Sequence, residues 1–236
     1  SESFDTVGPL CRTVSDANLM LSALEGSKSA DLSQSSLGGV KILIIENVVM
    51  DNLCSDSQNS FNNIIDILKA KGTEIDYKSF SEVEGAMSLG GTLVTTEAYG
   101  TWFEHIEKTP EVMFSQILKR FRLGKATSGA EYVDKWRKLK MLRQSFFEKI
   151  RSYDFILMPA SPILPPNMER LIKDEQYFET QNLLALRNTR LCNFLGTCAL
   201  TLPTSIPSCG VMLVGLPNTE AQLLRNGIAL EEVLSV

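Results

Sequence analysis

The chain has 236 residues, of which 44% are hydrophobic, a composition that is ordinary for a soluble globular protein and unlike that of disordered or fibrous chains. Its net charge of -5 gives no broad attraction to phosphate backbones or anionic membranes, so we expect neither nucleic acid nor a membrane as a partner. The five cysteines form no C-x-x-C pair, which predicts no metal site and fits reduced thiols in a cytoplasmic protein.

The first third of the sequence predicts two helices and two strands. Thr13 or Ser15 can cap a helix that ends at Gly26, because a hydroxyl accepts a hydrogen bond from a free backbone N–H and glycine readily adopts the left-handed conformation at a helix end. After a loop rich in serine and glycine come a β-branched strand at 40–45, a helix at 60–71 and a strand at 74–77. The order strand, helix, strand describes a βαβ unit with a parallel pair of strands.

The middle of the chain, residues 80–151, is mostly helical by the spacing of its apolar residues. We expect breaks near Gly90–Gly91, near Thr109–Pro110 and over 124–129, where glycine and proline interrupt the pattern. The longest helix is expected at 131–151, with apolar side chains three or four residues apart. The strands expected in the last third of the chain follow directly after this helix.

Three short apolar runs organise that last third, at 155–158, 199–202 and 211–214. Each stops at proline or glycine and suits a strand buried on both faces better than an alternating surface strand. Because a helix-length segment separates the first run from the second, the runs imply an α/β fold with one sheet covered by helices on both sides. A final helix is expected at 220–234.

The chain has one histidine, His105, so a Ser-His-Asp or Cys-His mechanism would have to use this imidazole. It lies in a segment with the pattern of an amphipathic helix, and no G-x-S-x-G motif accompanies it. We therefore expect a structural role for His105.

Several motifs together resemble one protein family. The run from Ser3 to Ala17, with Asp-Thr-Val-Gly-Pro at its centre, closely resembles the segment that follows the nucleophile region in the amidase signature family. Further matches follow in family order: Glu97–Tyr99, Leu123–Gly124, Tyr132–Asp134, Tyr153–Pro159, Asn193–Gly196 and Gly210–Gly215. The resemblance covers essentially the whole chain, which makes it far more specific than any one motif.

The resemblance implies a single mixed β-sheet with helices on both faces, and it makes residues 1–236 the C-terminal portion of one amidase signature domain without an internal boundary. Family members cleave carboxamide C–N bonds with a Lys-Ser-Ser triad that lies upstream of the Asp-Thr-Val-Gly-Pro segment. We therefore expect no catalytic residue in this chain, no activity from it alone and no cofactor. The missing N-terminal half is expected either in cis or as a second chain. The sequence does not decide whether the protein forms a homodimer.

The same resemblance suggests residues that line a substrate pocket. Tyr99 could orient a substrate carbonyl or amine, and Arg120 matches the position where glutamine-using members hold a substrate carboxylate. Asn188, Thr189 and Asn193 precede the strand at 199–202 and could hydrogen-bond a ligand. The alternative for Tyr99 is a structural position in the core, and for Arg120 it is a solvated charge on a helix surface. The alternative for the three polar residues before the strand is buried capping.

The function implied by the resemblance is hydrolysis of a small linear amide through a serine acyl-enzyme. One alternative is a glutamine-dependent amidotransferase that resembles the amidase-type component of glutamyl-tRNA amidotransferase. Leu186 argues against it, because it stands where those proteins have an aspartate that would pair with an ammonium group. Another alternative is a catalytically inactive, amidase-like binding module.

Overall fold

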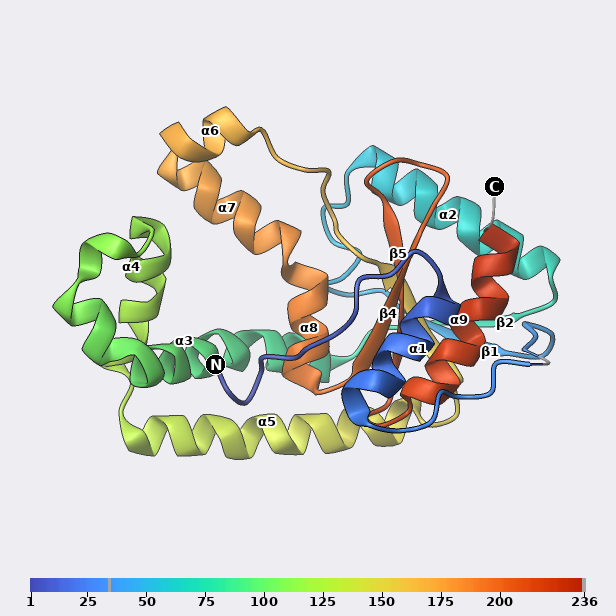
Figure 1. Ribbon diagram of the computed structural model, residues 1–236, viewed down its shortest axis with the longest axis horizontal. Helices are drawn as coiled ribbons and strands as arrows, with labels where there is room; N and C mark the ends of the chain where they lie inside the picture. The colour runs from blue at the N-terminus through green and yellow to red at the C-terminus, as the bar shows by residue number, and fades with distance from the viewer. Residues whose placement is uncertain (34, 235–236) are drawn as a thin grey trace.

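The computed structural model describes residues 1–33 and 35–234, and in this part of the chain one five-stranded sheet forms the centre (Figure 1). The strands are β1 (Lys41–Ile45), β2 (Glu74–Lys78), β3 (Phe155–Pro159), β4 (Cys198–Pro203) and β5 (Gly210–Gly215). Their order is β2-β1-β3-β5-β4. The first three neighbours run parallel, and β5 is antiparallel to both β3 and β4. The predicted mixed sheet and the predicted βαβ unit are both confirmed.

Helices surround this sheet and extend beyond it. They are α1 (Val14–Glu25), α2 (Ser55–Ala70), α3 (Ser81–Lys108), α4 (Ser115–Leu123), α5 (Gly129–Ile150), α6 (Met168–Lys173), α7 (Glu175–Ala185), α8 (Arg187–Leu195) and α9 (Glu220–Leu234). Single 3-10 turns at Pro110–Val112 and Gly124–Ala126 flank α4. The expected caps of α1 are present: the Thr13 hydroxyl accepts from Asp16 N at 3.0 Å, and Gly26 has a φ of 64°.

The central strand β3 divides its side chains between two hydrophobic cores. Ile156 and Met158 pack with α3, α5 and α8, whereas Phe155 and Leu157 pack with α1, α2 and α9. Successive side chains of a strand point to opposite faces, so a fully apolar run fits only a strand that is covered on both sides. Every residue of β3 is buried, as the sequence predicts.

The prediction of burial was wrong for the run at 199–202. This run forms β4, which lies at the edge of the sheet, and of its six residues only Leu202 is buried. Ala199 and Thr201 are exposed, and among the described residues β5 is the only strand that pairs with β4, whose other edge is unpaired. A short apolar run therefore predicted the strand but not its place in the sheet.

Two helix boundaries also differ from expectation. Helix α2 begins at Ser55 rather than at residue 60, because its first turn is polar and lies outside the apolar pattern. Helix α3 continues through Gly90–Gly91 without a break. A side chain at Gly90 would have its Cβ 2.4 Å from the Phe194 ring, so this glycine allows α8 to pack closely on α3. The expected breaks at Thr109–Pro110 and after Gly124 are present.

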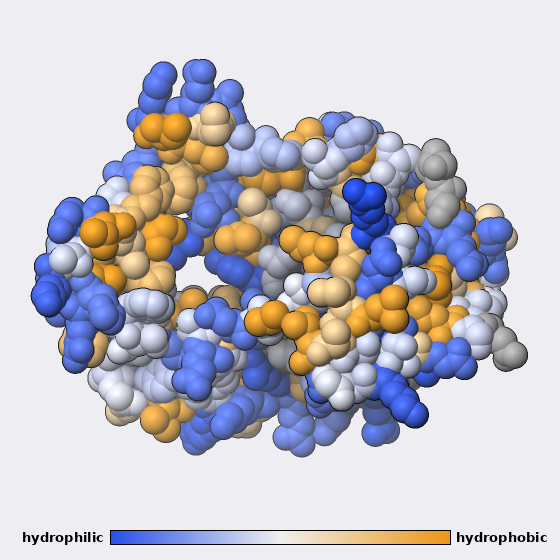
Figure 2. Space-filling view, in the orientation of Figure 1, coloured by the Kyte–Doolittle hydropathy of each residue, from blue (hydrophilic) through white to orange (hydrophobic). Residues whose placement is uncertain are grey.

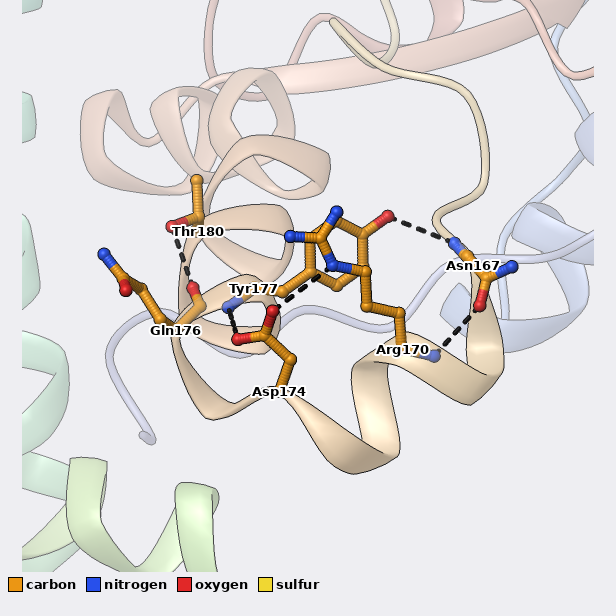
Figure 3. A network of polar contacts seen from close by, with 6 residues as sticks. All are labelled: Asn167, Arg170, Asp174, Gln176, Tyr177 and Thr180. Carbon is orange, nitrogen blue, oxygen red and sulfur yellow. Dashed lines mark hydrogen bonds and ion pairs between the residues drawn. The ribbon is translucent and has the colours of Figure 1, made fainter.

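Beyond the sheet, helices α4, α6 and α7 form a lobe (Figure 1). Polar contacts fix the turn between α6 and α7 (Figure 3). The Asp174 carboxylate caps α7 by accepting from Tyr177 N at 2.9 Å, which lowers the pKa of Asp174, and it also accepts from Arg170 Nε at 3.2 Å. The Arg170 guanidinium lies 4.1 Å from the centre of the Tyr177 ring, a cation–π distance. Within the described residues, no helix has the length and hydrophobicity needed to cross a bilayer.

Candidate functional site

An opening separates the lobe from the sheet region (Figure 2). Comparison with Figure 1 places α3, α4, α7 and α8 around it. The ring of helices is closed where α4 meets α7: Arg120 Nη1 donates to Asn182 Oδ1 at 2.8 Å, and the Phe114 and Phe178 rings meet edge to face at 5.3 Å. Lys119 adds an ion pair with Glu175 at 2.6 Å. The opening is thus a structural feature with a defined wall.

Three guanidinium groups, those of Arg120, Arg187 and Arg190, lie near one another on α4 and α8. Arg190 on α8 is half-buried and donates to the Leu183 carbonyl at 2.8 Å. Burial lowers the pKa of Arg190, and the like charges of Arg120 and Arg187 lower it further. Across the described part of the chain, none of the three is in an ion pair with a carboxylate. The charge of Asp51 acts on Arg187, so within the described residues the positive charge without a nearby carboxylate is that of Arg120 and Arg190, and such charge favours an anionic ligand.

Asn188 is fully buried at the start of α8. Its amide donates to the carbonyl oxygens of Pro159 at 2.7 Å and Val49 at 3.1 Å, and its Oδ1 accepts from Arg187 Nε at 3.1 Å. Arg187 also donates to Asp51 O and Val49 O. These bonds tie α8 to the end of β3 and to the loop after β1, so Asn188 has the geometry of a buried bridging residue.

The other expected site residues do not form one cluster. Thr189 is exposed and bonds its own helix, donating to Leu186 O at 3.1 Å. Asn193 is half-buried, and its backbone carbonyl accepts from Arg143 Nη2 at 3.1 Å. The structure therefore brings Arg120 near the first half of α8 but does not gather all five candidates around one point.

Tyr99 belongs to a separate network at the far end of α3. Its hydroxyl donates to Glu107 Oε1 at 3.3 Å, and the same carboxylate accepts from Arg122 at 2.8 and 3.2 Å. The paired hydrogen bonds from Arg122 lower the pKa of Glu107. Tyr99 is thus linked to Arg122, while Arg120 lies on the side of α4 that meets α7.

One anchor was not predicted as part of any site. Glu97 on α3 accepts from the Ser1 hydroxyl at 2.7 Å, from Ser3 N at 3.0 Å and from the Tyr132 hydroxyl at 2.8 Å. Burial opposes ionisation of Glu97, but these hydrogen bonds lower its pKa overall. Phe4, which follows Ser3, is buried, and its ring stacks on the Trp136 ring with 5.1 Å between the ring centres. Glu97 is the single charged residue in 85–103, and this isolated carboxylate was the available signal.

The segment that follows Phe4 is mostly exposed to solvent. Val7 is 87% and Leu10 104% exposed, and both lie within the motif run. Strand β4 likewise has three exposed residues along its length. Exposed apolar side chains on an extended segment are typical of a surface that another part of a protein covers. The described residues do not provide that cover.

Two similar proteins are longer than this chain. A relative from Comamonas testosteroni, 2-amino-5-chloromuconic acid deaminase, is 25% identical over 243 residues, which include 99% of this chain and 52% of the relative. A glutamyl-tRNA(Gln) amidotransferase component from Clostridium acetobutylicum is 25% identical over 274 residues, covering 98% of this chain and 56% of the relative. The chain therefore spans about half the length of these curated relatives.

Solved structures share the fold. A crystal structure of an amidase superposes with a TM-score of 0.83 at 22% identity, over 100% of this chain and 54% of the other. A fatty acid amide hydrolase superposes with a TM-score of 0.79 at 16% identity, over 99% and 49% of the two chains. The family model described as Amidase matches residues 1–224. The chain therefore belongs to the amidase family.

Proposed function

We propose that this chain is the substrate-shaping half of an amide hydrolase that cleaves carboxamide C–N bonds through a serine acyl-enzyme. The observation that carries the proposal is the opening beside α4 and α8, because Arg120 on α4 and Arg190 on α8 form no ion pair with a carboxylate in the described residues. Membership of the amidase family supports the bond type. The nucleophile and the oxyanion hole would come from the half that this chain does not contain.

The substrate proposed is a small linear amide that carries a carboxylate. Arg120 uses only Nη1 in its bond to Asn182, which leaves other N–H groups for a second partner. A guanidinium can hold a carboxylate with two parallel hydrogen bonds. The similar protein from Comamonas testosteroni is, by its name, a deaminase of an acid, which is consistent with an acidic substrate here.

The second half is proposed to cover the N-terminal segment and the β4 edge, either in cis or as a second chain. The exposed Val7 and Leu10 side chains and the unpaired edge of β4 support this placement. Without that half we expect no turnover above background, because pocket residues cannot replace a nucleophile.

The test is Arg120→Ala in the complete enzyme, with kcat/KM measured for an acidic amide and for its neutral analogue. Loss of a charge-assisted clamp should lower kcat/KM for the acidic amide by the equivalent of roughly 1.5 to 3 kcal/mol and leave the neutral one nearly unchanged. Arg120→Lys should restore only part of the loss, because an ammonium lacks the paired geometry. Arg137→Ala is the matched control, since Arg137 is exposed and pairs with Asp134 on α5. An unchanged ratio between the two substrates would remove Arg120 from the site.

A glutamine-dependent amidotransferase is the second candidate, and the relatives named as glutamyl-tRNA(Gln) amidotransferase components favour it. Leu186 weighs against it: its side chain is 44% exposed and offers no carboxylate to an amino acid's ammonium group. Glutaminase activity that depends on a partner protein and on tRNA would support this candidate. A complete protein that binds an amide, lacks the triad and turns nothing over would instead be a binding module.

A further inference from the structure

Two cysteine thiols contact the hydroxyl of Ser57 in the first turn of α2. Cys54 immediately precedes α2, and its thiol donates to Ser57 Oγ at 3.4 Å. The Cys209 sulfur, from the turn before β5, lies 3.9 Å from the same oxygen. Cys209 is 152 positions from Ser57 in the sequence, yet the packing of α2 beside the β4–β5 turn brings both thiols to this hydroxyl.

The two thiols differ in environment. Cys54 is half-buried, and although burial opposes ionisation, its hydrogen bonding with Ser57 and with nearby backbone groups lowers the pKa of its thiol. The partial positive charge at the start of a 16-residue helix acts in the same direction. Cys209 is buried, and burial raises the pKa of its thiol. One thiol is thus suited to react with an oxidant, and the other is sheltered beside it.

We propose that Cys54 and Cys209 form a peroxide-sensitive thiol pair, in which Cys54 is oxidised first and Cys209 resolves it to a disulfide. The geometry that carries this proposal is the shared contact of both sulfurs with Ser57 Oγ at the start of α2.

The steps balance with hydrogen peroxide as the oxidant. The Cys54 thiolate attacks one peroxide oxygen, the O–O bond breaks, and the products are a sulfenic acid on Cys54 and one water after proton uptake. The Cys209 sulfur then attacks the Cys54 sulfur, the S–O bond breaks, and the leaving hydroxide takes the Cys209 proton to form a second water. The two thiols lose two electrons and two protons in total, and the peroxide is reduced.

The pair lies next to the segment that leaves β3. Ser57 Oγ donates to Ser161 O at 3.2 Å, and Cys54 N donates to Pro162 O at 2.8 Å. Pro159, at the end of β3, is held by Asn188. A disulfide here would join the start of α2 to the β4–β5 turn beside that segment.

The other cysteines provide internal controls. Cys11 is exposed and tests whether solvent access alone explains reactivity. Cys192 is buried and interacts electrostatically with Cys198, so it tests whether proximity of two thiols is sufficient. Burial raises the pKa of Cys192 to about 12, and burial also raises that of Cys198, so we expect this second pair to stay reduced.

The experiment treats the complete, folded protein with hydrogen peroxide and maps disulfides by peptide mass spectrometry. The expected product joins the Cys54 and Cys209 peptides, is reversed by a dithiol and raises the Tm. Cys209→Ser should convert this product into a sulfenic acid on Cys54 that dimedone traps, and Ser57→Ala should slow the reaction. Cys11→Ser should leave the cross-link intact.

Two results would overturn the proposal. One is oxidation of Cys11 at the same rate as Cys54 with no joined peptide from protein whose circular dichroism remains native. The other is an equal dimedone yield on Cys54 in the wild type and in Cys209→Ser, because Cys209 would then not act as the resolving thiol.

Discussion

The sheet region and the helical lobe are stabilised by different interactions. In the sheet region β3 is buried along its whole length, and each of its faces contributes to a separate apolar core. In the lobe, α6 and α7 have no buried residue and α4 has only Leu118. Ion pairs, one amide contact and one aromatic pair join α4 to α7. The fold therefore depends on the first region, while α4 and α7, the part of the wall that the lobe provides, can change with little effect on the fold.

The largest effect should follow from a cavity in the sheet region. Phe146 on α5 is 0% exposed and meets Phe80 edge to face at 5.4 Å. Phe146→Ala should lower the free energy of unfolding by about 3–5 kcal/mol, because the truncated ring leaves a cavity that the packed core cannot fill. Denaturant unfolding of the complete protein measures this loss. Val133→Ala, on the same helix at a 66% exposed position, is the control and should stay within about 0.5 kcal/mol of wild type.

A smaller loss should follow where the sheet region meets the lobe. Asn188→Ala removes the donor to the Pro159 carbonyl and the acceptor of Arg187 Nε, while Val49 O keeps Arg187 as a donor, and buried polar groups that lose a partner cost about 1–3 kcal/mol. Chemical unfolding compares this variant with Thr189→Ala, whose exposed hydroxyl bonds only its own helix. Equal stability of the two variants would mean that the Asn188 bridge contributes nothing.

A buried carboxylate in the sheet region should make stability depend on pH. Glu82 is buried, which opposes its ionisation, but hydrogen bonds from Lys149 and Ser145 lower its pKa below that of an ordinary glutamate. The stabilisation is therefore present above the unfolded-state pKa and is lost as pH falls through the folded-state value. Glu82→Gln should lower the Tm at pH 7 and converge on wild type in acid. Glu84→Gln, at an exposed position on the same helix, should follow the wild-type curve throughout.

The smallest effect is expected in the lobe. Lys119→Ala removes contacts to Glu175 and Glu179, all three side chains being more than half exposed. Solvent and salt screen such pairs, so the global Tm should not change measurably. Limited proteolysis should nevertheless cut the lobe faster, and added salt should produce the same acceleration in the wild type. A clear fall in Tm would show that the lobe and the sheet region unfold as one unit.

The sequence predicted where helices and strands lie along the chain better than it predicted their burial and their contacts with distant residues. Apolar runs located β3 and β5, and the spacing in the final segment located α9, because these signals are local. Burial of β4 was predicted wrongly, since an apolar run does not say whether another strand lies alongside. The uninterrupted course of α3 depends on Gly90 meeting Phe194, a contact between distant residues that no local pattern reveals.

The candidate site shows the same limit. Arg120 was named from the resemblance, but its bond to Asn182 and its proximity to Arg190 depend on how α4, α7 and α8 meet. Cys54 and Cys209 were counted as separate thiols, because only the packing of α2 on the sheet brings them to one hydroxyl. Roles that depend on contacts between distant residues required the structure.

The sheet order also bears on how fast the chain folds. Strand β1 pairs with β3 through residues more than a hundred positions apart, and Lys41 N donates to Asp154 Oδ2 across 113 residues. The intervening chain includes α3 and α5, which pack on each other through contacts closer in sequence. Long-range parallel pairing carries the entropy cost of closing a long loop before the contacts between the strands stabilise it. Contacts within helices close no such loop and form early. We therefore expect registration of β3 against β1 to limit the rate of refolding, so that Ile156→Ala slows the refolding phase seen by stopped-flow fluorescence.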